Sequence, residues 1–222
     1  MTKYPKAIIF DLDGVITDTA EYHYQAWKQL AAELGITIDR EFNERLKGVS
    51  RMDSLERILA LKPELTLSQE EKERLATKKN EHYKELIKGI TPGDLLPGIP
   101  ELLAAIKEAG IPMALASASK NAPTVIKSLG VEHYFAHVVD AAKVEKGKPD
   151  PEIFFKAADA LGVPYEECIG VEDAPAGVEA INRAGMFSVG VGSKESLAHA
   201  DYVVSTTSEL VFENIIAQYN KR

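Results

Sequence analysis

Near the N-terminus, Ile8-Ile9-Phe10-Asp11-Leu12-Asp13-Gly14-Val15 joins an apolar run to two carboxylates. In open α/β sheets, ligands bind just beyond the carboxyl ends of the strands. Two acidic side chains at such an end, with Gly14 to turn the chain, indicate a site for a metal ion or a phosphoryl group. An isolated Asp-x-Asp is more often an Asx turn or a helix cap, so this interpretation depends on the rest of the chain.

The composition is that of an ordinary soluble globular protein, with 45% hydrophobic and 27% charged residues among 222. This length suits one large domain, or a core domain with a small insert. The formal charge of −8 disfavours nucleic acid and anionic membranes as partners, because phosphate groups attract basic surfaces. An anionic small substrate remains compatible if lysines and arginines gather locally.

Two further features concern redox state and location. Cys168 is the only cysteine, so no internal disulfide can form, and its apolar neighbours predict an inert core residue. Asp11 interrupts the first apolar run, which argues against a signal peptide, and no segment approaches membrane-spanning length. We therefore expect a cytoplasmic protein, and nothing in the sequence calls for more than a monomer.

From residue 98 onward, short apolar runs alternate with helical patterns. The runs are apolar on both faces, which is typical of a parallel sheet covered by helices. Strands that alternate with helices predict an α/β fold with a doubly wound parallel sheet. The expected strands are 6–10, 112–116, 138–139, 169–171, 187–191 and 202–204, and the expected helices are 100–109, 122–129, 151–161, 175–184 and 208–219.

Residues 18–87 break this alternation with helical patterns alone. Ala20, Tyr24, Trp27 and Ala31 recur at steps of three and four, as on one face of a helix, and Asp18 with Glu21 fits a capping box at its start. Further helical patterns cover 41–46, 53–61 and 69–87. We predict a core domain of residues 1–17 and 89–222, with an all-helical cap domain of residues 18–88 inserted after the first strand.

Three more groups of polar residues follow predicted strands or precede predicted helices. Glu172-Asp173 supplies hard oxygen ligands of the kind that Mg²⁺ prefers, although Asp173 alone is equally consistent with a helix cap. Ser117-Ala118-Ser119-Lys120-Asn121 fits a phosphate-binding loop at a helix start, although Ser119 or Asn121 is sufficient as a cap. Lys148, just before Pro149, fits a phosphate clamp, although a lone loop lysine is usually a solvated surface group.

Taken in order, Asp11-Leu12-Asp13-Gly14-Val15, Ser117, Lys148-Pro149 and Glu172-Asp173 resemble the four motifs of the haloacid dehalogenase superfamily. The resemblance implies a Rossmann-like core with a helical lid that enters after the first motif. It implies that Asp11 is a nucleophile forming an aspartyl-phosphate and that Asp13 is a general acid/base. Mg²⁺ is then expected at Asp11, the Asp13 carbonyl, Glu172 and Asp173, with Ser117 and Lys148 holding the transferring phosphoryl.

The insert resembles that of the sugar-phosphomutase branch of this superfamily. The resemblance implies that Arg51 grips a second phosphate and that His23, near the hinge residue Thr19, links substrate binding to Asp13. Met52 departs from the branch, where we expect an acidic residue. Ser50 and Asp53 also form an expected capping box, and Lys79 either reaches the rim or points into the cleft. The remaining residues expected at substrate are Lys47, Gly48, Val49, Ser50, Ala118, Ser119, Lys120 and Asn121.

The expected function is therefore that of an isomerase. It would interconvert β-D-glucose 1-phosphate and glucose 6-phosphate through β-glucose 1,6-bisphosphate, the activating intermediate, with a phosphorylated hexose as substrate. A sugar-phosphate phosphatase with the same Asp11 chemistry is the nearest alternative. A phospho-aspartate signalling receiver domain is a more distant one, since it lacks a helical insert and places its phosphorylated Asp after a later strand.

Overall fold

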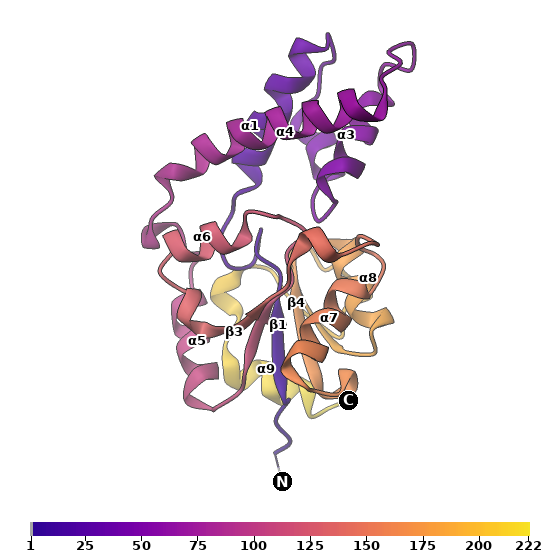
Figure 1. The fold of residues 1–222 in the computed structure, drawn as a ribbon. Helices are drawn as coiled ribbons and strands as arrows, with labels where there is room; N and C mark the ends of the chain where they lie inside the picture. Colours follow the sequence, from indigo (N-terminus) through magenta and orange to yellow (C-terminus); the bar gives the residue numbers. More distant parts are fainter. Residues whose placement is uncertain (1) are drawn as a thin grey trace.

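The computed structural model describes residues 2–222, with a sheet lobe below and a helical lobe above it (Figure 1). All neighbouring strands of the six-stranded sheet pair in parallel, in the order β3-β2-β1-β4-β5-β6. The strands are β1 (Ala7–Phe10), β2 (Met113–Leu115), β3 (Phe135–Val138), β4 (Cys168–Glu172), β5 (Phe187–Val191) and β6 (Tyr202–Val204). The doubly wound parallel sheet predicted from the sequence is confirmed.

Helices cover both faces of the sheet, because side chains alternate between the faces along each strand. Ile8 and Phe10 of β1 pack into a cluster with residues of three helices on one face, whereas Ala7 and Ile9 pack with residues of two helices on the other. The first set is α5 (Ile99–Glu108), α6 (Ala122–Ser128) and α9 (Phe212–Tyr219), and the second is α7 (Glu152–Leu161) and α8 (Pro175–Arg183).

The upper lobe contains four helices around a core of their own, which includes Trp27, Leu55 and Ile58. They are α1 (Ala20–Glu33), α2 (Arg40–Glu44), α3 (Arg51–Leu59) and α4 (Gln69–Leu86), and α4 packs along α1. Side-chain caps fix the beginnings of the last two. Ser50 accepts a hydrogen bond from the Asp53 amide, but the Asp53 carboxylate accepts the Ser50 hydroxyl and not its backbone amide, so only half of the expected capping box forms. Ser68 forms a full capping box with Glu71.

The two lobes are joined by two crossings that lie side by side. The Thr17 hydroxyl donates to the Asp94 carbonyl at 2.7 Å, and the Leu96 amide donates to the Ile16 carbonyl at 3.0 Å. Ala26 and Tyr83 of the helical lobe belong to the same buried cluster as the sheet residues, so the base of the lid is continuous with the core. Boundaries at 17/18 and 88/89 remain a prediction.

Three local expectations differ from the structure. β3 spans Phe135–Val138 rather than 138–139, and α9 begins at Phe212 because a separate 3₁₀ turn covers Thr207–Glu209. The Asp18–Glu21 capping box is wrong. Thr19 is the N-cap of α1, Asp18 forms an Asx turn to the Ala20 amide, and Glu21 binds Gln25 and Arg40 instead.

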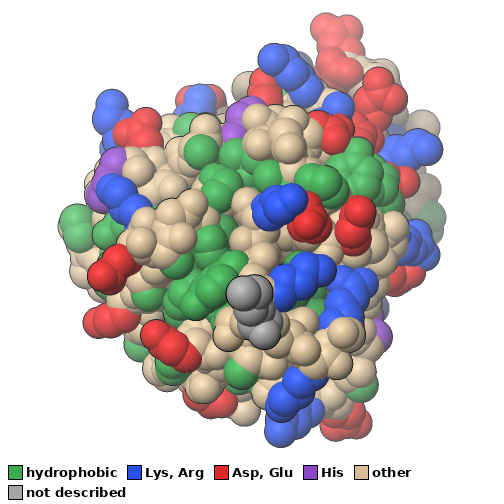
Figure 2. Space-filling model, turned by 90° about the horizontal axis from the view of Figure 1, so that it is seen from below, with side chains coloured by type: hydrophobic (Ala, Val, Ile, Leu, Met, Phe, Trp, Pro, Cys, Tyr) green, Lys and Arg blue, Asp and Glu red, His purple; other side chains and the backbone are tan. Residues whose placement is uncertain are grey.

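The surface at the amino ends of the strands lies on the opposite side of the molecule from the lid. Figure 2 shows acidic and basic side chains there, close to one another and interspersed with hydrophobic ones. Nothing in that view gathers charge of a single sign into a broad patch. Among the helices of residues 2–222, none is both long and apolar enough to cross a membrane.

Candidate active site

Asp11 lies at the carboxyl end of β1, where its amide donates to the Val171 carbonyl of β4 at 2.9 Å. Its side chain is almost buried, with the residue 4% exposed. The Lys148 ammonium donates to Asp11 Oδ1 at 2.9 Å and to Glu172 Oε2 at 2.7 Å. Burial opposes the charge of Lys148, but the Asp11 and Glu172 carboxylates raise its pKa above the ordinary value. Lys148 is therefore a fixed cation beside Asp11.

Glu172 ends β4 and is completely buried. Its Oε1 accepts the amides of Asp173 and Ala174 at 3.0 and 3.1 Å. Its carboxylate fits against α8 only because residue 177 is glycine, since a Cβ there would lie 2.0 Å from Oε2. The first turn of α8 and the end of β4 are thus shaped around this carboxylate.

Asp11, Glu172 and Asp173 form a group in which one carboxylate oxygen from each residue lies within 4.8 Å of the others. Burial and the neighbouring carboxylates raise the pKa of both Asp11 and Asp173. Gly14, at φ 75°, leaves room for Asp173, because a Cβ there would lie 2.1 Å from its Oδ2. Three crowded oxygen donors of this kind fit a hard divalent cation, which would relieve their mutual repulsion.

The two oxygens of Asp13 have different surroundings. Oδ1 accepts the Thr19 amide at 3.0 Å and also the Thr19 hydroxyl, whereas Oδ2 lies 3.9 Å from His23 Nε2. Burial raises the pKa of Asp13, and the two Thr19 hydrogen bonds partly oppose that rise. Since Oδ1 already has two donors, Oδ2 is the oxygen better placed to exchange a proton.

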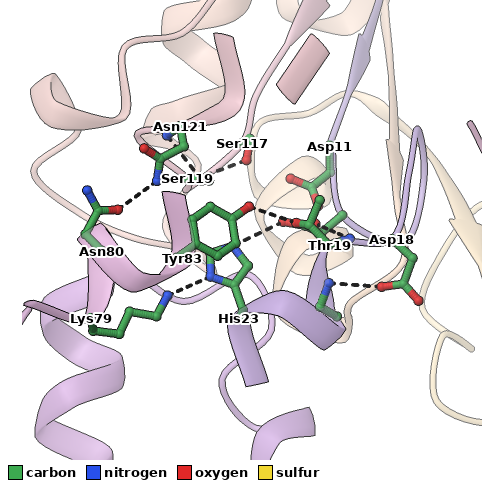
Figure 3. Close-up of polar contacts among 12 residues, drawn as sticks. Asp11, Asp18, Thr19, His23, Lys79, Asn80, Tyr83, Ser117, Ser119 and Asn121 are labelled. Atoms are coloured by element: carbon green, nitrogen blue, oxygen red, sulfur yellow. Dashed lines mark hydrogen bonds and ion pairs between the residues drawn. The ribbon is translucent and has the colours of Figure 1, made fainter. Parts of the chain in front are cut away.

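Lys79 points inward from α4 and reaches His23 (Figure 3). Its ammonium lies 2.8 Å from His23 Nδ1 and 4.7 Å from the centre of the Trp27 ring, a cation–π distance. Burial, with the charge of Arg51, lowers the pKa of Lys79 to about 7. Burial also lowers the pKa of His23 well below its usual value. A Lys79 N–H donated to Nδ1 leaves the ring proton on Nε2, toward Asp13.

Between the lobes lies a cleft of about 600 Å³. The residues that line this cleft do not include Thr19, Lys148 or Glu172. Lys148 borders a second cavity of about 230 Å³. The other candidate residues from the sequence line the cleft itself: Asp11, Asp13, His23, Lys47, Gly48, Val49, Ser50, Arg51, Lys79, Ser117, Ala118, Ser119, Lys120, Asn121 and Asp173.

Two basic side chains of the lid border the cleft in different states. Lys47 pairs with Glu44 at 2.8 Å. Burial opposes its charge, but Glu44 raises its pKa overall. Arg51 begins α3 and is half-buried; burial lowers its pKa, and the Glu81 carboxylate only partly opposes this. Arg51 is therefore the lid cation with more to gain from an anion in the cleft.

The loop after β2 is organised by its own side chains. Ser117 Oγ accepts the Ser119 amide at 3.1 Å, and Ser119 Oγ accepts the Asn121 amide at 3.3 Å. Asn121 also donates from its side chain to Asn80 Oδ1 of α4 at 2.8 Å, so the loop is tied to the lid (Figure 3). Phosphate binding by this loop remains a prediction.

Trp27, Asn80 and Tyr83 were not predicted at the site from the sequence, although Trp27 and Asn80 line the cleft and Tyr83 contacts Thr19 and His23. Trp27 and Tyr83 lie on the apolar stripes of α1 and α4, where core packing is the ordinary interpretation. Tyr83 follows Lys79 by four residues, so both lie on the same side of α4. That i, i+4 spacing beside a buried lysine was the one available signal.

Comparison with known proteins gives the family. Residues 5–185 match the family model described as haloacid dehalogenase-like hydrolase. The chain belongs to that family.

Relatives within this haloacid dehalogenase-like family include both mutases and phosphatases. The chain is 50% identical over 209 residues to the β-phosphoglucomutase of Bacillus subtilis, covering 94% of this chain and 92% of that one. It is 33% identical to a phosphorylated carbohydrates phosphatase of Thermotoga maritima, over 82% of each chain. The crystal structure of a Clostridium difficile β-phosphoglucomutase superposes with a TM-score of 0.96 and 52% identity, over 98% of each chain.

Proposed function

We propose that this chain is a β-phosphoglucomutase, an isomerase that interconverts β-D-glucose 1-phosphate and glucose 6-phosphate through β-glucose 1,6-bisphosphate. The observation that carries the proposal is one cleft with an acidic, lysine-clamped centre on the core and Arg51 on the lid. A mutase needs two phosphate sites of this kind. The relatives that bear the β-phosphoglucomutase name support the same conclusion.

Asp11 is the proposed nucleophile. Its carboxylate attacks the phosphorus of a sugar phosphate, a P–O bond to Asp11 forms, and the P–O bond to the sugar breaks. Lys148 neutralises charge beside the attacking carboxylate, and Ser117 lies at the adjacent strand end. Asp11, the Asp13 carbonyl, Glu172 and Asp173 would hold Mg²⁺, which when bound supplies positive charge to offset that of the phosphoryl oxygens.

Asp13 is the proposed general acid/base. It gives a proton to the sugar oxygen that leaves and takes one from the sugar hydroxyl that attacks the phosphorylated Asp11. The hydrogen bonds from Thr19 to Oδ1 support Oδ2 as the oxygen that makes this exchange. His23 lies on α1 of the lid with its ring nitrogen 3.9 Å from Oδ2, so the lid supplies a partner for Asp13.

The lid supplies the proposed second phosphate site. Arg51 and Lys47 would hold the phosphate that is not being transferred, together with the α3 N-terminus capped by Ser50. Ser119, Lys120 and Asn121 of the core loop border the same cleft, and Ser117 would stay with the transferring phosphoryl. Gly48 and Val49 complete this wall, and Lys79 faces the sugar side of the same cleft. A cytoplasmic location and a monomeric state belong to this proposal as well.

A sugar-phosphate phosphatase is the second candidate, because the Thermotoga maritima relative carries that activity in its name. In a phosphatase, water replaces the sugar hydroxyl in the second step. A receiver domain is contradicted by the haloacid dehalogenase-like family match and by the four-helix lid.

One assay separates the two candidates. Purified protein with Mg²⁺ and a trace of β-glucose 1,6-bisphosphate is given β- or α-glucose 1-phosphate, and glucose 6-phosphate and inorganic phosphate are measured in parallel. We expect rapid formation of glucose 6-phosphate from the β-anomer only, with little phosphate. Stoichiometric phosphate release from either substrate would establish the phosphatase instead.

A further inference from the structure

Tyr83 is fully buried where the lid meets the core. It lies on α4, one helical turn after Lys79. Its hydroxyl donates to Thr19 Oγ1 at 3.2 Å, and its ring stacks on that of His23 with centroids 4.0 Å apart and planes at 15°. Figure 3 shows the Tyr83 hydroxyl pointing toward Thr19 and the ring overlapping that of His23 in the view. Tyr83 therefore contacts both Thr19, the N-cap of α1, and His23 of α1, and each of these two residues lies next to Asp13.

Because Tyr83 is the donor in its hydrogen bond to Thr19, it determines where the Thr19 hydroxyl proton points. A threonine hydroxyl has a single proton and two lone pairs. When Tyr83 donates to one lone pair, the Thr19 proton is left to point at its other close partner, Asp13 Oδ1. Tyr83 thus keeps Thr19 a donor to Oδ1 and leaves Oδ2 for proton exchange.

The stacked ring acts on the other side of Asp13. His23 is held between the Tyr83 face and the Lys79 ammonium, which contacts Nδ1 at 2.8 Å. With its plane fixed in this way, Nε2 stays 3.9 Å from Asp13 Oδ2. The same phenol therefore restrains the surroundings of both carboxylate oxygens.

We infer that Tyr83 is a positioning residue for Asp13, acting through the Thr19 hydroxyl and the plane of the His23 ring. This inference rests on the proposed function, because it takes Asp13 to exchange a proton with a sugar oxygen. If Tyr83 were only a core aromatic, its hydroxyl would matter for stability and would not distinguish one chemical step from another.

The test is Tyr83→Phe, which removes the hydroxyl and keeps the stacked ring. For conversion of β-glucose 1-phosphate we expect kcat to fall about fivefold, as for one lost hydrogen bond, with KM changed less than twofold. Aspartyl-phosphate formation from acetyl phosphate should fall much less, because the acetate leaving group needs no proton from Asp13. Tyr83→Leu, which also removes the stack, should lose more.

Thr19 provides the coupling control. In a Thr19→Val background, Tyr83→Phe should cause no further loss of kcat, because the hydroxyl through which it acts is gone. In a Thr19→Ser background, which keeps a hydroxyl, the fivefold loss should return. Tyr24→Phe is the matched control, since Tyr24 lies on α1 beside His23 but faces the separate lid core; its kcat and KM should equal those of the wild type.

Three results would overturn the inference: an unchanged kcat in Tyr83→Phe, equal losses in the mutase and acetyl phosphate reactions, or the same loss whether residue 19 is Thr or Val. Failure of the proposed function looks different, because wild-type protein would then release phosphate without forming glucose 6-phosphate. In that case the kcat of sugar-phosphate hydrolysis replaces the mutase readout, since Asp13 must still protonate the leaving sugar oxygen.

Discussion

Among single residues, Lys79 is a buried cation, 3% exposed, whose ammonium contacts a histidine nitrogen. The unfolded chain keeps a proton on this lysine up to its ordinary pKa of 10.5, whereas the folded chain keeps it only up to about pH 7. Between these values the unfolded state binds more protons, so this residue makes stability rise with pH. Below pH 7 the free-energy cost of burying the charged Lys79 ammonium is fully present.

Lys79→Met removes that dependence while keeping a side chain of similar length. We expect its urea-unfolding free energy, relative to the wild type, to be highest at pH 7 and to decrease steadily toward pH 10. Urea titrations at four pH values across this range measure the difference. Lys78→Met, an exposed neighbour, should show a constant difference, and the same slope in both variants would mean that Lys79 titrates normally.

Arg51→Ala separates the two phosphate sites. Arg51 lies on the lid, so it should contact the phosphate that is not at Asp11. Losing one charge-assisted contact should cost about 1.5–3 kcal/mol, measured as a loss of roughly 10- to 150-fold in kcat/KM for β-glucose 1-phosphate.

Acetyl phosphate is the internal control for Arg51→Ala, because it has no second phosphate to hold. Aspartyl-phosphate formation from it should change little. Parallel losses in both reactions would mean that Arg51 supports the core site. No loss in either reaction would mean that Arg51 contacts no phosphate.

At the scale of elements, sequence patterns predicted most of the fold because burial is periodic. The helices of the lid and the strands of the sheet lie within a few residues of their expected ranges, since apolar stripes and runs mark them directly. β3 was misplaced because its residues are only partly buried at the sheet edge. The Asp18 cap failed because Arg40, distant in sequence, binds Glu21.

The site was predictable only in part, for a related reason. Acidic residues at strand ends and a lysine just before a helix stand out in a sequence, so Asp11, Asp13, Lys148 and the Glu172–Asp173 pair could be predicted to lie together. Tyr83 resembles any core aromatic, and Gly177 resembles a weak helix residue. Their importance comes from contacts made across elements, which no local pattern records.

Gly177→Ala tests one such contact between β4 and α8. Helix propensity alone predicts a gain of about 0.5–1 kcal/mol. The new Cβ would instead collide with the Glu172 carboxylate, which Lys148 and two amides hold in place. We expect a net loss of about 1–3 kcal/mol in unfolding free energy, measured by urea denaturation.

Gly89→Ala is the matched control, because a Cβ there would meet no atom within 4 Å. It should change the unfolding free energy by less than about 0.5 kcal/mol. If Gly177→Ala were as well tolerated, the Glu172 carboxylate would have to be mobile rather than clamped.

At the scale of the whole molecule, the acidic cluster couples metal binding to stability. Asp11, Glu172 and Asp173 crowd together with Lys148 as their buried cation. Without a metal, their repulsion opposes folding. With Mg²⁺ at a hundred times its dissociation constant, the folded state should gain about 2.7 kcal/mol, or a rise of roughly 5–10 °C in Tm. Activity should vanish with EDTA.

Asp173→Asn should reverse the order of stability. In EDTA the variant should melt above the wild type, because one repelling charge is gone; in Mg²⁺ it should melt below, because one ligand is weaker. Thermal melts of both proteins in both buffers measure this crossing. Glu195→Gln, on the surface, should follow the wild type in each buffer. Parallel shifts for Asp173→Asn and wild type would remove Asp173 from the metal site.

In the proposed function the cleft has unlike ends, since Asp11 would carry out the phosphoryl transfer and Arg51 would only hold a phosphate. A bisphosphate formed there presents one phosphate to Asp11 and must offer the other before the cycle closes. It has to turn end for end, and the lid must open far enough to let it do so. Some molecules will escape during that turn and leave a dephosphorylated enzyme behind. Progress curves should therefore begin with a lag that shortens as bisphosphate is added.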